Sequence, residues 1–144
     1  MKKAIMIIIA AALVLLTVSC TTKAAAEDFK ATGEYKGYEY SISTVGMEMF
    51  LDIEGNPTTG YQWMLLTESG SFTVMSSDYT QGAAPAGMTG VGGTYHFVIV
   101  FTPDAEQQLD FSYCRSWDPS DNPVDLSLKV TLKGSRIVDV SVVD

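Results

Sequence analysis

Two segments of the sequence alternate apolar and polar side chains with a period of two residues. The apolar positions are Met47, Met49, Leu51 and Ile53 in the stretch 47–54, and Leu126, Leu128, Val130 and Leu132 in the stretch 126–133. Because successive side chains of a strand point to opposite faces, this alternation predicts strands with one buried face. Weaker patterns predict further strands at 38–43, 61–67, 72–79, 94–102, 109–114 and 136–143. About eight short strands separated by turn residues predict an all-β sandwich.

The connections between these strands fall into two groups. Strands that alternate in direction place every second connection at the same end of a sandwich. The connections at 55–60, 80–93 and 115–124, which we name the first, second and third loops, are therefore expected at one end. The connections at 68–71, 103–108 and 134–135, which are short and ordinary turns, are expected at the other end.

None of the three loops carries the groups of an active site. The first loop reads GNPTTG, and a tight hairpin turn explains Asn56, Pro57 and Gly60 but does not require two threonines. The second loop is rich in Gly and Ala, and no helical pattern follows its glycines as a dinucleotide site needs. The third loop contains Arg115 and Trp117, residue types that often anchor protein interfaces. The loops fit either plain connections or a binding surface.

Residues that perform catalysis or bind metals are few and dispersed. His96, the only histidine, is expected at a strand edge, and Cys114 lies in another predicted strand. Asp52 and Glu54 share a strand face, as a glycosidase pair does, but they alternate with buried residues like an ordinary exposed face. Three further acids lack the spacing of a calcium-binding loop and are interpreted as a solvated turn: Asp118, Asp121 and Asp125. We expect no metal, no cofactor and no enzymatic activity, and a hydrolase that uses His96 or the acid pair is the least favoured hypothesis.

The first 19 residues predict a signal peptide. Lys2 and Lys3 precede a run of 13 apolar residues at 4–16, and small residues follow before a cleavage site. The run is shorter than the roughly 18 residues that span a membrane. We therefore expect an exported protein.

The stretch TVSC at 17–20 resembles a lipoprotein signal, in which Cys20 becomes the first mature residue and its sulfur carries lipid. Such signals usually have Leu where Thr17 stands. The resemblance implies a cell-envelope lipoprotein held on a membrane through Cys20. The alternative is ordinary cleavage near Cys20 or at 24–26, which leaves a secreted or periplasmic protein. In both cases residues 20–32 are expected to form a flexible tether and 33–144 a single domain.

Charge and cysteine content limit the partners of the chain. Cleavage before Cys20 removes 19 of the 144 residues and two lysines, so the formal net charge changes from −8 to −10. Such a chain repels nucleic acid, which we therefore exclude as a partner. With Cys20 lipidated, Cys114 has no partner for an intramolecular disulfide. We expect a monomer whose fold depends on its apolar core alone.

Together the three loops resemble those of the chagasin family of cysteine peptidase inhibitors. That family has an immunoglobulin-like β-sandwich with three loops at one end, and their motifs are Asn-Pro-Thr-Thr-Gly-Tyr/Phe, Gly-x-Gly-Gly and Arg-Pro-Trp. The matching residues are Asn56, Pro57, Thr58, Thr59, Gly60 and Tyr61, then Gly90, Val91, Gly92 and Gly93, then Arg115 and Trp117. Ser116 stands where the third motif usually has Pro. The resemblance extends over nearly all of the mature domain.

The resemblance implies a reversible, non-covalent inhibitor of papain-like cysteine peptidases. Family members insert the first loop into the active-site cleft, while the other two loops contact its flanks. This implies that Thr58 and Thr59 lie near the catalytic cysteine and histidine of the peptidase. Trp117 is then an apolar anchor, and Arg115 either orients the third loop or meets an acidic rim. Ser116 is expected to leave the third loop freer than Pro does.

A binding module of another kind is the alternative function. In that case a surface-tethered β-sandwich holds a glycan or another protein through the same loops. Three aromatic residues are then expected to stack on sugar rings: Tyr61, Trp63 and Trp117.

Overall fold

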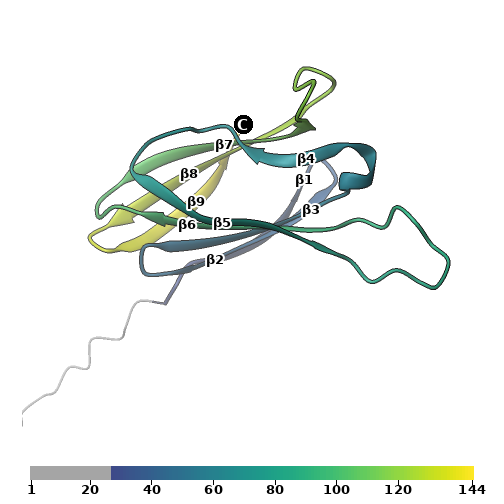
Figure 1. The fold of residues 1–144 in the computed structure, drawn as a ribbon. Coiled ribbons are helices and arrows are strands. Elements are labelled where there is room, and N and C mark those ends of the chain that lie inside the picture. Colours follow the sequence, from purple (N-terminus) through teal and green to yellow (C-terminus); the bar gives the residue numbers. More distant parts are fainter. Residues whose placement is uncertain (1–26) are drawn as a thin grey trace, which may run out of the picture.

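The computed structural model describes residues 27–144, which form two antiparallel sheets packed face to face (Figure 1). In spatial order, the first sheet contains β1 (Lys30–Tyr35), β2 (Tyr38–Val45), β3 (Glu48–Gly55), β6 (Gly93–Phe101) and β5 (Phe72–Gln81). The second contains β4 (Tyr61–Leu65), β7 (Glu106–Arg115), β8 (Val124–Lys133) and β9 (Arg136–Val143). The predicted all-β sandwich is confirmed. The predicted signal peptide, Cys20 and the tether as far as residue 26 lie outside the described residues.

The described chain has nine strands, and β1 was not among those predicted. This strand, KATGEY, begins at Lys30 and crosses the expected boundary between tether and domain at residue 33. Its less exposed positions are Ala31, Gly33 and Tyr35, so no apolar alternation marks it. It is an edge strand whose one neighbour is β2. Pairing in the tertiary structure, rather than a local pattern, makes this segment a strand.

The apolar residues of the two alternating segments fill the space between the sheets. Leu51 of β3 and Leu128 of β8 have no exposed surface, and Lys129 beside Leu128 is exposed. Aromatic contacts join the sheets, because Phe97 of β6 meets Phe111 of β7 edge to face with ring centroids 5.1 Å apart. The other buried members of the alternating segments are Met49, Ile53, Leu126, Val130 and Leu132, whereas Met47 is half-buried.

The first, second and third loops, which the structure bounds at 56–60, 82–92 and 116–123, lie together at one end of the sandwich (Figure 1, right). Strands β3, β5 and β7 run toward this end, and β4, β6 and β8 return from it, as the antiparallel pairing requires. The predicted grouping of the loops is confirmed. The described chain starts at the opposite end, where the Asp28 carboxylate accepts a hydrogen bond from Arg136 Nη2 at 2.8 Å. Between residues 27 and 144, no helix is long and apolar enough to cross a membrane.

Candidate functional site

The first loop folds as a single 3-10 turn, η1 (Pro57–Thr59), that its own side chains close. Asn56 precedes the turn, and its Oδ1 accepts hydrogen bonds from the Thr58 amide at 3.1 Å and the Thr58 hydroxyl at 2.6 Å. The Thr59 hydroxyl donates to the Asn56 carbonyl oxygen at 2.8 Å. Gly60 ends the turn at a φ of 84°, in the left-handed region that favours glycine. Both threonines therefore stabilise the turn, although both side chains stay exposed.

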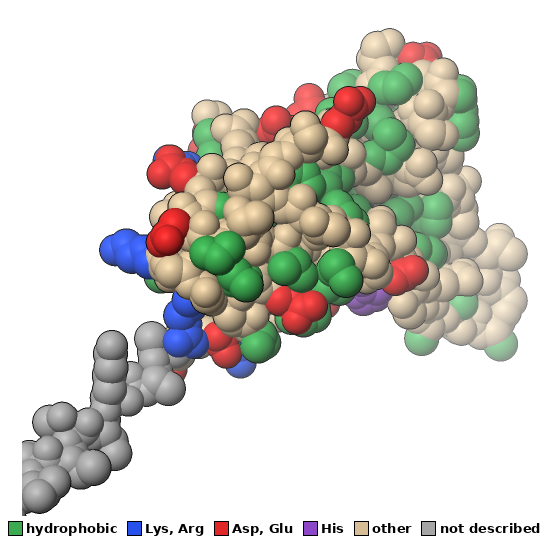
Figure 2. Space-filling model, turned by 60° about the vertical axis from the view of Figure 1, so that its left-hand side comes forward, with side chains coloured by type: hydrophobic (Ala, Val, Ile, Leu, Met, Phe, Trp, Pro, Cys, Tyr) green, Lys and Arg blue, Asp and Glu red, His purple; other side chains and the backbone are tan. Residues whose placement is uncertain are grey.

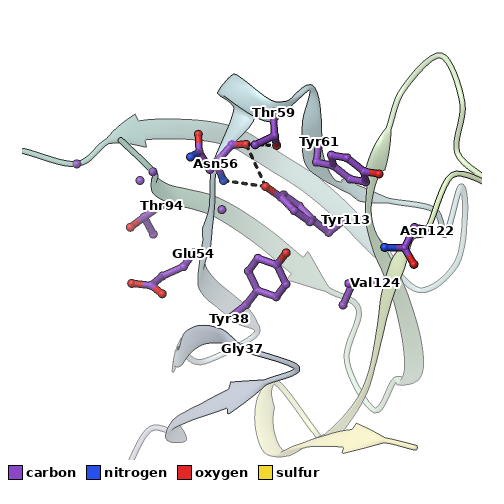
Figure 3. A pocket seen from close by; sticks show the side chains of 14 residues that line it. Gly37, Tyr38, Glu54, Asn56, Thr59, Tyr61, Thr94, Tyr113, Asn122 and Val124 are labelled. Atoms are coloured by element: carbon purple, nitrogen blue, oxygen red, sulfur yellow. Dashed lines mark hydrogen bonds between the residues drawn. The ribbon is translucent and has the colours of Figure 1, made fainter. Parts of the chain in front are cut away.

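Two core side chains support the chain next to this turn. Tyr113 of β7 is 5% exposed, and its hydroxyl accepts from the Asn56 N–H at 2.8 Å and donates to the Asn56 carbonyl at 3.1 Å (Figure 3). Trp63 of β4 is 3% exposed, and its indole N–H donates to the Glu54 carbonyl at 2.8 Å. Trp63 is thus a core residue, so the expectation that it stacks on a sugar ring is wrong.

The Asn56 side chain also joins the first loop to the second. Its Nδ2 donates to the carbonyl oxygen of Gly90 at 2.8 Å. Val91 and Gly92 are half-buried below the exposed stretch 82–90. Gly93 is the first residue of β6 and lies between β3 and β5, where a Cβ would collide with a backbone carbonyl of β5. The four residues that match the second motif therefore extend from the exposed part of the second loop into the first residue of β6.

An ion pair closes the third loop, and Tyr61, the residue after the first loop, contacts both of its members. Arg115 Nη1 lies 2.6 Å from Asp121 Oδ2, and the guanidinium group lies over the Tyr61 ring at 4.8 Å from its centroid. The Tyr61 hydroxyl donates to the Asp121 carbonyl oxygen at 3.0 Å. Burial, and next the hydrogen bond to Asp121, raises the pKa of Tyr61, whereas the positive charge of Arg115 opposes this shift. Asp121 lies in a turn with 40% of its side chain exposed, as predicted, and its carboxylate in addition orients Arg115, which the sequence did not indicate.

Trp117 completes the contact between the third loop and the first. Its side chain is 71% exposed, the highest value among the large apolar residues of the described chain. One edge of its ring lies over Gly60, because a Cβ added to Gly60 would be 2.7 Å from Trp117 Cη2. Ser116 beside it is exposed. Through Gly90 on one side and Trp117 on the other, the three loops form one continuous edge.

Comparison with known proteins identifies the family. The sequence model of the chagasin family peptidase inhibitors (I42) matches residues 43–132, a range that contains all three loops. The chain belongs to the chagasin family of peptidase inhibitors. Amoebiasin-1 of Entamoeba histolytica is similar to it, with 33% identity over 81 residues that cover 56% of this chain and 78% of that protein. The resemblance seen in the sequence is confirmed, and the protein is an inhibitor of cysteine peptidases rather than an enzyme.

A groove of about 720 Å³ lies beside the first loop of this chagasin-family chain (Figure 3). Three tyrosine rings follow one another along it, with centroids 4.9 Å apart for Tyr38 and Tyr113 and 5.6 Å apart for Tyr61 and Tyr113. Burial, and next the neighbouring Tyr113 and Tyr61, raises the pKa of Tyr38. The groove is further lined by Gly37, Glu54, Gly55, Asn56, Thr59, Gly82, Gly92, Gly93, Thr94, Asn122 and Val124. Because Asn56 and Thr59 form part of its wall, the shape of the groove depends on the conformation of the first loop.

Of the residues considered for catalysis, Glu54 lines the groove, whereas Asp52, His96 and Cys114 do not. His96 is on β6, between β3 and β5, so the expectation that it lies at an edge is wrong. Its Nδ1 is 2.6 Å from Asp52 Oδ1, and its Nε2 is 3.1 Å from the Thr80 hydroxyl. Cys114 is fully buried in the other sheet, so it forms no pair with His96. Within residues 27–144, no three side chains of His, Cys, Asp or Glu come together as metal ligands.

Proposed function

We propose that this inhibitor acts on papain-like cysteine peptidases, reversibly and without a covalent bond, by placing the first loop in the active-site cleft. Residues 90–93 and 115–117 then contact the two flanks of the cleft. The observation that carries the proposal is the continuous edge, in which Asn56 Nδ2 bonds to Gly90 and the Trp117 ring lies over Gly60. One peptidase molecule meets all three loops at once, and we propose a complex of one peptidase with one inhibitor monomer.

The tip of the first loop suits the active site of such a peptidase. The reactive cysteine is a thiolate paired with an imidazolium, whose ring N–H groups are donors. The hydroxyls of Thr58 and Thr59 donate to Asn56 and retain acceptor lone pairs that are exposed at the tip. An acceptor facing an imidazolium makes a favourable, charge-assisted hydrogen bond.

The turn geometry supports an inserted loop that the peptidase does not cleave. A scissile carbonyl has to approach the thiolate at close range with its orbitals aligned. In η1, the Asn56 carbonyl accepts from the Thr59 hydroxyl, and the Pro57 carbonyl accepts from the Gly60 N–H at 2.9 Å. Both carbonyls therefore have partners inside the turn. Since Pro57 also restricts the backbone, the loop loses little conformational entropy on binding.

Recognition by these loops depends on shape and apolar contact more than on charge. The stretches 56–60 and 82–92 contain no charged residue. Figure 2 shows the lysine and arginine side chains in view gathered near the other end of the sandwich. Arg115 is engaged with Asp121 and Tyr61, which supports a role in orienting the third loop rather than in meeting an acidic rim. Trp117 is left as the apolar anchor of that loop.

The proposal is tested by titrating the chain from Thr21 onward into papain and cathepsin L with a fluorogenic substrate. We expect reversible inhibition in the nanomolar range with one-to-one stoichiometry. Arginine at both tip positions, Thr58→Arg with Thr59→Arg, should abolish it because the enlarged tip no longer fits a cleft. Arginine at two exposed threonines elsewhere, Thr73→Arg with Thr102→Arg, is the matched control. Equal inhibition by both double variants, or no inhibition by the folded parent at micromolar concentration, contradicts the proposed mechanism.

We further propose that the protein is exported and anchored in a cell-envelope membrane by lipid on Cys20. The charged start, the apolar run at 4–16 and the TVSC stretch support this. The domain begins at the end opposite the loops, so an anchor there leaves the loops facing away from the membrane (Figure 1). In cells, Cys20→Ala in the full chain should move the protein from the membrane fraction to the soluble fraction. An unchanged membrane fraction contradicts the anchor.

A further inference from the structure

The Tyr113 hydroxyl connects the core of the sandwich to the first loop. Tyr113 belongs to the four-stranded sheet, whereas Asn56 follows the last residue of β3 in the five-stranded sheet, 57 positions away in sequence. The hydroxyl accepts from the Asn56 N–H and donates to the Asn56 carbonyl, so one side-chain atom satisfies both backbone groups of a single residue. Figure 3 shows the ring pointing from β7 toward the loop.

The position of this hydroxyl is determined by close packing of its ring. Ring centroids lie 4.9 Å from Tyr38, 5.6 Å from Tyr61 and 5.3 Å from Trp63. On the side of β3, a Cβ at Gly55 would lie 3.2 Å from the Tyr113 ring, so the absence of a side chain there admits the ring. A side chain packed in this way has little rotamer freedom. The hydroxyl is therefore a rigid reference point for Asn56.

Asn56 transmits this position to two loops. Its Oδ1 holds Thr58, its carbonyl oxygen holds Thr59, and its Nδ2 holds Gly90 of the second loop. We propose that Tyr113 is a positioning residue, which holds the first and second loops in their inhibitory arrangement before a peptidase is bound. This inference rests on the proposed function of the loops, and Tyr113 itself is too buried to contact the peptidase.

The inference predicts a specific kinetic signature. If only part of the molecules hold the competent loop conformation, the apparent affinity is reduced by that fraction. Without the hydroxyl, the Asn56 N–H and carbonyl lose their partner from the core. Loss of a buried hydrogen bond commonly lowers the equilibrium constant for the conformation that it stabilises by about fivefold to tenfold. We expect Tyr113→Phe to lower the association rate constant by about twofold or more, with about tenfold as the upper limit, and to leave the dissociation rate constant nearly unchanged. Loss of a direct contact instead acts mainly on dissociation.

The experiment compares Tyr113→Phe with Tyr79→Phe. The Tyr79 hydroxyl is buried without a hydrogen-bond partner in the described chain, so its removal takes away the same atom without affecting Asn56. Association and dissociation rates with papain are measured by stopped flow, and active-site titration gives the folded, active fraction. A merely structural role would lower that fraction and leave the association rate per active molecule unchanged. That result, or equal rates for both variants, overturns the inference.

Hydrogen exchange of the loop amides decides the same question without a peptidase. Tyr113→Phe should speed exchange at the Gly60 amide, which donates within η1, while Tyr79→Phe leaves it unchanged. Unchanged exchange in Tyr113→Phe overturns the inference. If the parent protein fails to inhibit papain but exchange increases in Tyr113→Phe alone, the positioning role stands and the choice of target is refuted instead.

Discussion

Because Trp117 is largely exposed, its substitution is the most direct test of whether the third loop contributes to inhibition. Its side chain is 71% exposed in the free protein and touches the first loop at Gly60. The substitution Trp117→Ala therefore removes little of the core, and we expect the free energy of unfolding to change by about 0.5 kcal/mol or less. In the proposed complex, by contrast, this ring is the apolar anchor on one flank of the cleft.

The size of the effect follows from the exposed area. A tryptophan side chain buries up to about 250 Å², so covering the exposed part removes roughly 180 Å² from water. At about 25 cal/mol per Å², this corresponds to an upper limit of about 4.5 kcal/mol. Ordering the side chain opposes binding by about 1 kcal/mol, and an interface leaves part of the ring hydrated. We therefore expect Trp117→Ala to weaken inhibition by about 2 kcal/mol or more, roughly thirtyfold in the inhibition constant.

The assay is a titration of each variant into papain with a fluorogenic substrate, alongside a thermal melt. The control is Leu66→Ala, which removes an apolar side chain that is 47% exposed in the connection after β4, at the end away from the loops. The control should inhibit like the parent protein. An inhibition constant for Trp117→Ala within about threefold of the parent, with an unchanged melt, would remove the third loop from the mechanism.

Two further predictions concern stability. Leu128 has no exposed surface, so Leu128→Ala should lower the free energy of unfolding by about 2–5 kcal/mol in urea denaturation, and a loss below about 1 kcal/mol would contradict its place in the core. Burial, and next the neighbouring Tyr113 and Tyr79, raises the pKa of Tyr95 to about 12 from a usual value of 10.0. Above pH 10.0 the unfolded chain therefore loses this proton before the folded chain does, and the free energy of unfolding falls as the pH rises toward 12. The free energy of unfolding of Tyr95→Phe should fall less steeply with pH than that of the parent protein over this pH range. Equal slopes for the two proteins would contradict the raised pKa of Tyr95.

Local patterns were sufficient to predict the layers and the loop end. In β3 and β8 one face packs in the core and the other meets solvent, so the alternation in the sequence matches the burial in the structure. Successive strands that run in opposite directions place every second connection at the same end, which is where the three loops lie. The strand β1 had no such signal, because Ala31 and Gly33 on its less exposed face are small and the edge strand gains its conformation from pairing with β2.

Patterns were not sufficient for the contacts within the site. The motifs pointed to Asn56 and Arg115, but their partners Tyr113 and Asp121 went unrecognised. In the sequence, Tyr113 is one more inward-facing residue of a predicted strand, and Asp121 is one of several acidic residues in a predicted turn. The residues between Arg115 and Asp121 form turns rather than a helix or strand, so no periodicity indicates that the two side chains meet. Likewise, only the burial of Trp63 removed it from the aromatic residues available to a ligand.

The sequence by itself determined the fold class, the direction of the strands, the family and the identity of the three loops. These depend on local periodicity and on short motifs, which are readable along the chain. Only the tertiary structure decided which contacts hold the loops. Asn56 forms hydrogen bonds with Tyr113 and Gly90, and Arg115 forms an ion pair with Asp121. The physical reason is that a hydrogen bond requires its two atoms within about 3 Å, a condition set by the packing of two sheets rather than by spacing in sequence.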